Sequence, residues 1–159
     1  MIDSIVPAIG EILVKKGWTL GTAESCTGGL VAATLTDFSG SSAWFSGAVV
    51  AYSNEIKMSL LHVPEEAIME HGAVSEATVR AMAEGVCRTL GTDAGVSLSG
   101  IAGPTGGTPD KPVGTVWMGW HVHGKTHAEC FLFSGNRMEV KQQSLEKALE
   151  HLLNYLKQA

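Results

Sequence analysis

The sequence predicts an α/β fold in which a largely parallel sheet carries helices on both faces and ends in an antiparallel hairpin. Three short apolar segments with strand character, 18–23, 48–52 and 94–99, are separated by segments with helical periodicity. Strands that alternate with helices along a chain pair in parallel and place the helices on the faces of the sheet. Two later strands, 115–122 and 126–133, flank a turn at Gly124-Lys125 and predict the hairpin.

The predicted helices follow from apolar spacing together with start and stop signals. Apolar residues recur every three or four positions, and glycine, proline or a capping serine marks most of the ends. Six helices are predicted. The first ends near Gly17, the second covers 30–38 and the third covers 55–61. The fourth begins at Pro64, the fifth runs from Ser75 to Gly91, and the sixth covers 137–157. The glycine- and proline-rich segment from Gly100 to Gly114 is predicted to be an irregular loop.

Composition limits the class of protein. The 159 residues, 45% hydrophobic and 17% charged, predict one globular domain over 1–159. The net charge of −5 without a run of Lys or Arg argues against a nucleic-acid partner. No apolar stretch approaches membrane-spanning length, so no membrane partner is expected. Three scattered cysteines and the lack of a signal peptide predict a reducing cytoplasm and neither a disulfide framework nor a zinc ribbon.

The turn ESCTGG (24–29) is the first candidate for chemistry, because it joins a predicted strand to a predicted helix. Ligands of open α/β sheets bind at this edge, and free amides at a helix start can hold an oxyanion. The two glycines allow a substrate to approach the backbone. The position predicts Ser25 as a nucleophile, with Cys26 or Thr27 as alternatives. Spacing alone favours a purely structural role, in which Ser25 or Thr27 caps the helix, because glycines are common where a strand turns into a helix.

A second candidate is YSNEIK (52–57), which follows the next predicted strand. Lys57 lies about one helical turn beyond a cap at Ser53 or Asn54. A lysine acts as a general base only if burial or nearby positive charge lowers its pKa. Tyr52 offers a hydroxyl that can relay a proton. The alternative is a solvated lysine in the first turn of a helix.

Three further segments carry candidate binding groups. The loop from Gly100 to Gly114 follows the third strand, so its amides can cradle a phosphate, with Lys111 adding charge. Arg137 follows a candidate Asn136 cap and suits a phosphate or carboxylate. In GSS (40–42) the serines cap the next element, or Ser42 joins the site.

The histidines predict no metal site. His121 and His123 alternate onto one face of their strand. A tight turn at Gly124-Lys125 would pair His127 with Val122 and turn its side chain to the other face. Structural or surface roles are therefore expected for them.

Seven segments together resemble the CinA C-terminal domain family. They appear in the family's order and span nearly the whole chain. The segments are AESCTGG (23–29), GSSAWF (40–45), YSNEIK (52–57), HGAVSE (71–76), SGIAGPTGG (99–107), KPVGTVW (111–117) and GNR (135–137). Each one is a weak signal, but the ordered set is specific.

This resemblance implies both a fold and an activity. The fold is a three-layer α/β/α sandwich with a mixed, mostly parallel sheet. The activity is deamidation of nicotinamide mononucleotide to nicotinate mononucleotide and ammonia, which recycles pyridine nucleotides for NAD. The chemistry would need a serine and a lysine and no metal or other cofactor.

Carried onto this sequence, the resemblance implies Ser25 as nucleophile, Lys57 as base and Tyr52 as an assisting hydroxyl. Ser41 and Ser42 also lie in a family motif and stay alternative nucleophiles. The expected substrate-binding residues are Glu24, Cys26, Thr27, Gly28, Gly29, Ser42, Gly103, Thr105, Gly106, Gly107 and Arg137. The phosphate is expected on Gly103 to Gly107, on Arg137 or on both.

The expected partners are a small-molecule nucleotide and further copies of the chain in a homo-oligomer. Three other functions fit the sequence. They are an amidase for another small amide, a hydrolase that uses Cys26, and a nucleotide-binding module without catalytic activity.

Overall fold

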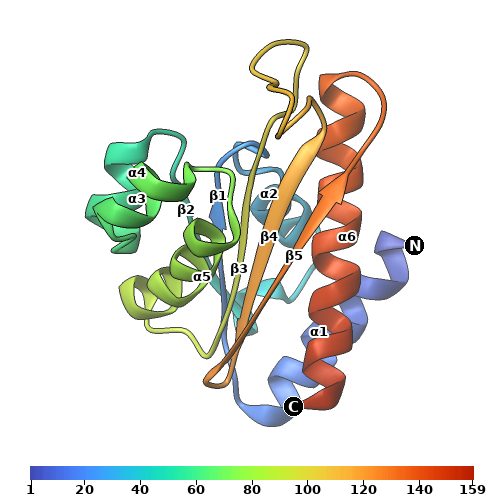
Figure 1. The fold of residues 1–159 in the computed structure, drawn as a ribbon. Coiled ribbons are helices and arrows are strands. Elements are labelled where there is room, and N and C mark those ends of the chain that lie inside the picture. The colour runs from blue at the N-terminus through green and yellow to red at the C-terminus, as the bar shows by residue number, and fades with distance from the viewer.

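A computed structural model describes all 159 residues and contains one five-stranded mixed sheet in the order β2-β1-β3-β4-β5 (Figure 1). The strands β1 (Leu20–Glu24), β2 (Phe45–Val50) and β3 (Ala94–Gly100) are parallel. The hairpin of β4 (Thr115–Val122) and β5 (Lys125–Leu132) adds the antiparallel strands on the β3 side. The predicted mixed α/β sheet is therefore confirmed.

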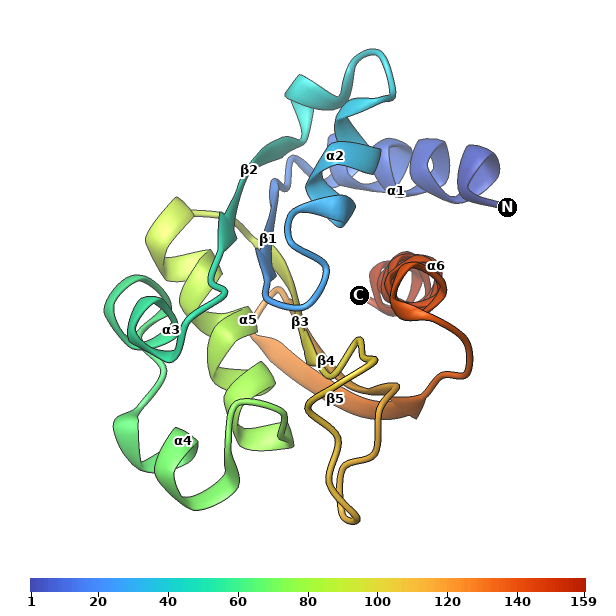
Figure 2. The ribbon, with the colours of Figure 1, turned by 90° about the horizontal axis from the view of Figure 1, so that it is seen from above.

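Helices cover both faces of the sheet and complete the three predicted layers (Figure 2). One face carries α1 (Ile2–Lys16), α2 (Leu30–Thr36) and α6 (Arg137–Gln158). The other carries α3 (Asn54–Leu61), α4 (Glu65–His71) and α5 (Glu76–Leu90). A separate buried apolar cluster fills the space between the sheet and each helical layer. None of the helices combines the length and apolar character that crossing a membrane requires.

Two sequence predictions about strands were wrong in detail. β2 begins at Phe45 and ends at Val50, so Ala51 and Tyr52 lie beyond the strand and not within it. The hairpin turns at residues 123–124, one residue earlier than predicted, so His127 pairs with Trp120. Trp120 and Val122 are two positions apart on β4 and point to the same face, so His127 still lies on the face that the sequence predicted.

The histidine side chains are held by neighbours within the fold. His127 stacks on Tyr155 at 4.1 Å between ring centroids, and His123 stacks on Trp18 at 4.5 Å. His121 bonds the Thr126 hydroxyl through Nδ1 at 2.8 Å. These contacts agree with the structural roles that the sequence predicted.

Register aligns the ends of the three parallel strands. Glu24, the last residue of β1, pairs with Val50 on one side and with Leu98 on the other. The amide of Ala51 continues this pairing by donating to the Glu24 carbonyl at 2.8 Å, and the amide of Ser25 donates to the Leu98 carbonyl at 2.9 Å. Ser25 is thus held between the segments that follow β2 and the end of β3.

Candidate active site

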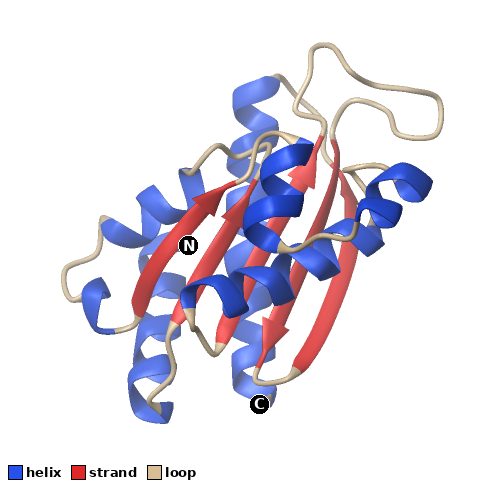
Figure 3. Ribbon diagram, turned by 90° about the vertical axis from the view of Figure 1, so that its left-hand side faces the viewer, coloured by secondary structure: helices blue, strands red, loops and turns tan.

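A cavity of about 360 Å³ lies at the edge where the parallel strands end. The turn after β1, the start of α3, the loop after β3 and the start of α6 all reach this edge (Figures 1 and 3). Its lining residues are Ser25, Cys26, Tyr52, Asn54, Lys57, Ala73, Val74, Ser99, Gly100, Ile101, Ala102, Gly103, Thr105, Gly106 and Arg137. Segments that are far apart in the sequence therefore line one cavity.

A lysine and a serine contact each other in this cavity. The Nζ of Lys57 lies 3.0 Å from the Oγ of Ser25, although 32 positions separate them in the chain. The same nitrogen lies 2.9 Å from the Ala51 carbonyl and 3.2 Å from the Tyr52 carbonyl. Both carbonyls are free for this role because β2 ends before them.

Local structure explains how Lys57 reaches this position. The Ser53 hydroxyl caps α3 by accepting from the Ile56 amide at 3.2 Å. Side chains on a helix lean toward its N-terminus, so the stem of Lys57 points back toward the end of β2. The lysine is 1% exposed and Ser25 is 8% exposed. Bulk water is therefore largely excluded from the contact between them.

Burial lowers the pKa of Lys57 below its ordinary value of 10.5, because an ammonium loses hydration in this setting. The one charge that opposes this effect is that of Cys26, when that thiol is ionised. Burial raises the pKa of Cys26 itself to about 11, so at neutral pH this opposing charge is absent. The site thus favours an uncharged lysine.

The three acceptors around Lys57 suit both forms of its amine. A neutral amine has two N–H groups, which the Ala51 and Tyr52 carbonyls can accept, and one lone pair left for the Ser25 hydroxyl proton. An ammonium has a third N–H, which the Ser25 oxygen can accept. A proton can therefore pass between Ser25 and Lys57 without movement of either side chain, as a base and its nucleophile require.

Glu24, predicted to bind substrate, instead holds the turn and the helix behind Ser25. Its fully buried carboxylate accepts from the amides of Val31 and Ala32, both at 2.9 Å. It also accepts from the hydroxyls of Thr27 at 2.8 Å and Thr22 at 3.0 Å. The carboxylate takes the place of a side-chain cap at the start of α2, and it does not line the cavity.

These contacts decide which backbone amides can serve as an oxyanion hole. At the start of α2, the amides of Val31 and Ala32 donate to the Glu24 carboxylate, and in the turn before it the Gly28 amide donates to the Ser25 carbonyl at 3.1 Å. The amides of Thr27 and Gly29 donate to no group of the protein, and the Cys26 amide faces only the thiol of its own residue. The Cys26 amide follows the candidate nucleophile directly, which is where serine hydrolases commonly place an oxyanion donor.

The other candidate nucleophiles in the turn are less suited than Ser25. The thiol of Cys26 is protonated near neutral pH because of its raised pKa, and a thiol is a much weaker nucleophile than a thiolate. The Thr27 hydroxyl donates to the Glu24 carboxylate. Of the three, Ser25 alone bonds the lysine.

Tyr52 and Arg137 meet at the rim of the cavity. One guanidinium nitrogen of Arg137 donates to the Gly103 carbonyl at 2.6 Å, and another lies 3.4 Å from the Tyr52 hydroxyl. Tyr52 is 65% exposed, and it reaches Lys57 with its carbonyl and not with its hydroxyl. The predicted proton-relay hydroxyl thus lies at the rim with Arg137.

The remaining predicted residues divide between the cavity and other places. Thr105 and Gly106 line the cavity, whereas Gly107 packs against the backbone of 112–113. Thr27, Gly28 and Gly29 lie outside the cavity lining, in the turn beside it. Lys111 is tied by its Nζ to the His71 carbonyl at 2.7 Å.

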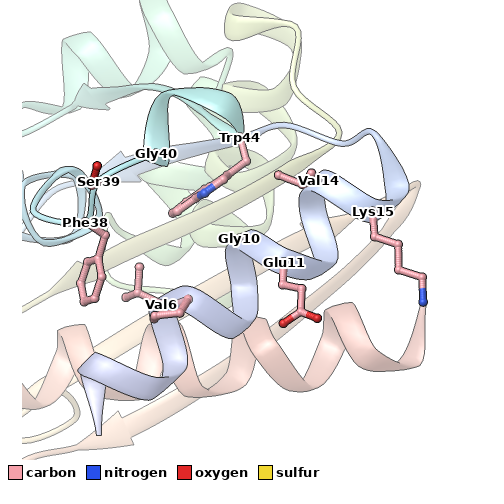
Figure 4. Close-up of a pocket in the computed structure, with 10 residues that line it drawn as sticks. Val6, Gly10, Glu11, Val14, Lys15, Phe38, Ser39, Gly40 and Trp44 are labelled. Carbon is pink, nitrogen blue, oxygen red and sulfur yellow. The ribbon is translucent and has the colours of Figure 1, made fainter.

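Ser41 and Ser42 do not meet the candidate pair. They lie in the short helix η1 (Ser41–Ala43), which precedes β2 and so lies at the opposite edge of the sheet. Gly40 and Trp44, which flank this helix, line a separate groove of about 640 Å³ beside α1 (Figure 4). The structure therefore does not support either serine as the partner of Lys57.

Sequence reasoning missed two polar residues of the cavity, Ser99 and Asn54. Ser99 is 1% exposed, and its hydroxyl bonds no group of the protein. Its place beside Ser25 follows from the parallel register of β1 and β3, which was the available signal. Asn54 was considered only as a helix cap, but Ser53 is the cap and Asn54 lines the cavity. No cluster of three or more His, Cys, Asp or Glu side chains is arranged to hold a metal ion.

Comparison with known proteins places the chain among similar sequences. The family model described as "CinA C-terminal domain" matches residues 2–156. A "putative competence-damage inducible protein" of Symbiobacterium thermophilum is 47% identical over 97% of this chain. A "CinA-like protein" of Gemmatimonas aurantiaca is 52% identical over 94%. The chain spans only 38% and 35% of these two relatives, respectively.

Solved structures agree over the full fold. A competence-damaged protein (CinA) superfamily protein from Klebsiella pneumoniae superposes with a TM-score of 0.95 and 35% identity, covering 100% of this chain and 99% of that one. A competence/damage inducible protein from Agrobacterium tumefaciens gives a TM-score of 0.92 and 36% identity, covering 96% and 95%. The arrangement of layers and strands is thus shared with experimentally determined folds.

Proposed function

The chain belongs to the CinA C-terminal domain family, and from that premise we propose that it is an amidohydrolase acting on nicotinamide mononucleotide. The products would be nicotinate mononucleotide and ammonia. The observation that carries the proposal is the buried contact of 3.0 Å between Lys57 Nζ and Ser25 Oγ. Buried lysines without a carboxylate partner are costly to keep, and perturbed groups of this kind concentrate at functional sites.

The reaction begins with Lys57 uncharged. Its lone pair takes the Ser25 proton as the Ser25 oxygen attacks the carboxamide carbon. The carbonyl oxygen becomes an oxyanion, for which the Cys26 amide is the nearest candidate donor along the chain. The new ammonium of Lys57 then gives its proton to the departing nitrogen, and ammonia leaves from an acyl-serine.

Hydrolysis of the acyl-serine restores the protein. Lys57 is again neutral and takes a proton from water, which attacks the ester carbon. The Ser25 oxygen leaves and regains its proton from Lys57, and the acid product loses its remaining proton to solvent and is released as the carboxylate. The division into two steps suits a carboxamide, since covalent catalysis replaces one difficult displacement with two easier ones. The pyridinium ring withdraws electrons from the carboxamide and assists the first attack.

Ammonia release from nicotinamide mononucleotide tests the proposal. Turnover should fall by about 10³-fold or more in Ser25→Ala and in Lys57→Met, because nucleophile and base act as one unit. Cys26→Ala is the matched control in the same turn and should keep most of the activity. Circular dichroism of each variant checks that the fold is retained.

Specific results would contradict the proposal. Activity above a few per cent in Lys57→Met would mean that Lys57 is not the base. Loss of activity in Cys26→Ala with retention in Ser25→Ala would favour a cysteine hydrolase. Tight nucleotide binding by the unaltered protein without ammonia release would favour a binding module. Oligomer formation stays a prediction from the resemblance, and location in the cytoplasm stays a prediction from the cysteines and the absence of a signal-peptide pattern.

A further inference from the structure

One cation beside the candidate active site has no partner. Lys57 contacts Ser25, Lys111 donates to a carbonyl, and Arg80 is paired with Glu76 at 2.8 Å. By contrast, the Nζ of Lys141 makes no hydrogen bond or ion pair with the protein, although the residue is half-buried on α6. A cation that is partly withdrawn from water without a counter-charge is suited to bind an anionic ligand.

The position of Lys141 relates it to the turn after β1. Its Nζ lies 3.9 Å from the point that a Cβ on Gly28 would occupy, so it stands directly over that glycine. Its charge is close enough to lower the pKa of the Cys26 thiol slightly against the dominant effect of burial. Lys141 also follows Arg137 by four residues, so the two cations lie one above the other along α6.

Backbone donors lie in the same turn. The amides of Thr27 and Gly29 donate to no group of the protein, and the positive φ of Gly28 and Gly29, 62° and 102°, sets the path of the turn between them. A side chain at Gly28 would project toward Lys141. The missing side chain therefore leaves this stretch of backbone open next to an unpaired ammonium.

From this arrangement we propose that Lys141, with Arg137 beside it, binds the phosphate monoester of the nucleotide substrate over the turn at Gly28. The inference rests on the proposed function, in which Ser25 attacks the carboxamide at the other end of the same ligand. The phosphate site gives a role to Gly28 and Gly29, which lie in the turn beside the cavity but are not among its lining residues. A contact of Lys141 with the phosphate would distinguish the mononucleotide from the corresponding riboside.

Charge supports this assignment. The chain carries a net charge of −5, so a dianionic phosphate is repelled by the protein as a whole and needs a local cation. An ammonium serves as a point charge for phosphate, whereas a guanidinium can bond it with two parallel N–H groups. Arg137 already donates one hydrogen bond to the Gly103 carbonyl and lies near the Tyr52 hydroxyl, so Lys141 is the cation here without a hydrogen-bond partner in the protein.

Two substrates that differ only in the phosphate provide the test. Steady-state kinetics with nicotinamide mononucleotide and nicotinamide riboside should be measured for the unaltered protein, Lys141→Met and Lys141→Arg. In Lys141→Met we expect KM for the mononucleotide to rise about tenfold, or about 1.4 kcal/mol, with kcat within twofold. The riboside should be unaffected, and Lys141→Arg should recover most of the loss. Lys147→Met is the control, because Lys147 lies on the same helix with comparable burial but pairs with Glu150 at 3.7 Å, and this variant should leave the kinetics of both substrates unchanged.

Some outcomes would overturn the inference. An unchanged ratio of kcat/KM for the two substrates in Lys141→Met would exclude a phosphate contact, and so would an equal loss on both. Calorimetric binding of both ligands to Lys57→Met, which lacks the base, separates this question from catalysis. If no variant releases ammonia but Lys141→Met still weakens binding of the mononucleotide alone, the proposed reaction fails and the phosphate site stands.

Discussion

Replacement of Glu24 by glutamine tests whether this carboxylate holds the start of α2. Glutamine keeps the shape of the side chain but turns one acceptor oxygen into an NH₂ group. Each oxygen of Glu24 accepts from one backbone amide, of Val31 or Ala32, and from one threonine hydroxyl, of Thr22 or Thr27. In either orientation the new NH₂ faces a backbone N–H, which cannot reverse its direction, although the threonine can rotate to accept.

The expected loss follows from these contacts. One buried backbone donor loses its acceptor, which costs about 1–3 kcal/mol, and the remaining bonds lose the strength that a charged acceptor adds. We expect Glu24→Gln to lower the free energy of unfolding by about 2–4 kcal/mol. The Ser25 turn lies against the same carboxylate network, so kcat should fall as well, while the contact between Lys57 and Ser25 keeps some activity.

Urea denaturation followed by circular dichroism measures this loss. The matched control is Glu139→Gln in the capping box of α6, where the carboxylate accepts from the Asn136 amide through one oxygen at 2.9 Å. The oxygen of glutamine can replace that single acceptor, so the control should change stability by less than about 0.5 kcal/mol. A loss below about 1 kcal/mol in Glu24→Gln, or equal losses in both variants, would refute the structural role.

Three further predictions concern the base and the packing of the helix that carries it. The neutral amine of Lys57 is the reactive form, so kcat/KM should rise with pH through its lowered pKa and then level off; a profile that falls over that range would contradict the assignment. Between this pKa and 10.5 the unfolded lysine binds a proton that the folded one does not, so stability relative to Lys57→Met should rise with pH, by up to about 1.4 kcal/mol per unit. In Gly85→Ala the new Cβ would fall on the backbone carbonyl of Leu61 and push α3 away from α5, so we expect a loss of about 2–4 kcal/mol in urea denaturation and reduced ammonia release. The exposed Arg88→Ala on the same helix should change stability by less than about 0.5 kcal/mol, and a Gly85→Ala protein as stable as this control would show that the helices can separate without cost.

Local patterns in the sequence determined the elements and the edge of the sheet that carries the site. Helical spacing with a capping serine predicted a helix from Ser75 to Gly91. In the structure α5 runs from Glu76 to Leu90, capped by Ser75, and Gly91 takes the left-handed conformation that such a helix end needs. The apolar strand before ESCTGG placed Ser25 at a strand end. These features depend on neighbours a few residues away, so the order of residues alone is sufficient to reveal them.

Only the tertiary structure decided which of the candidate groups meet. The parallel register of β1 with β2 brings the Ala51 and Tyr52 carbonyls around Lys57 and sets its amine against Ser25. Burial of that amine, and hence its lowered pKa, depends on helices and strands that are distant in the chain. The same packing directs the Glu24 carboxylate to the backbone amides at the start of α2 and away from the cavity. Hydrogen bonds and desolvation act over a few ångströms in space, whatever the separation along the sequence, and no local pattern of residue types specifies them.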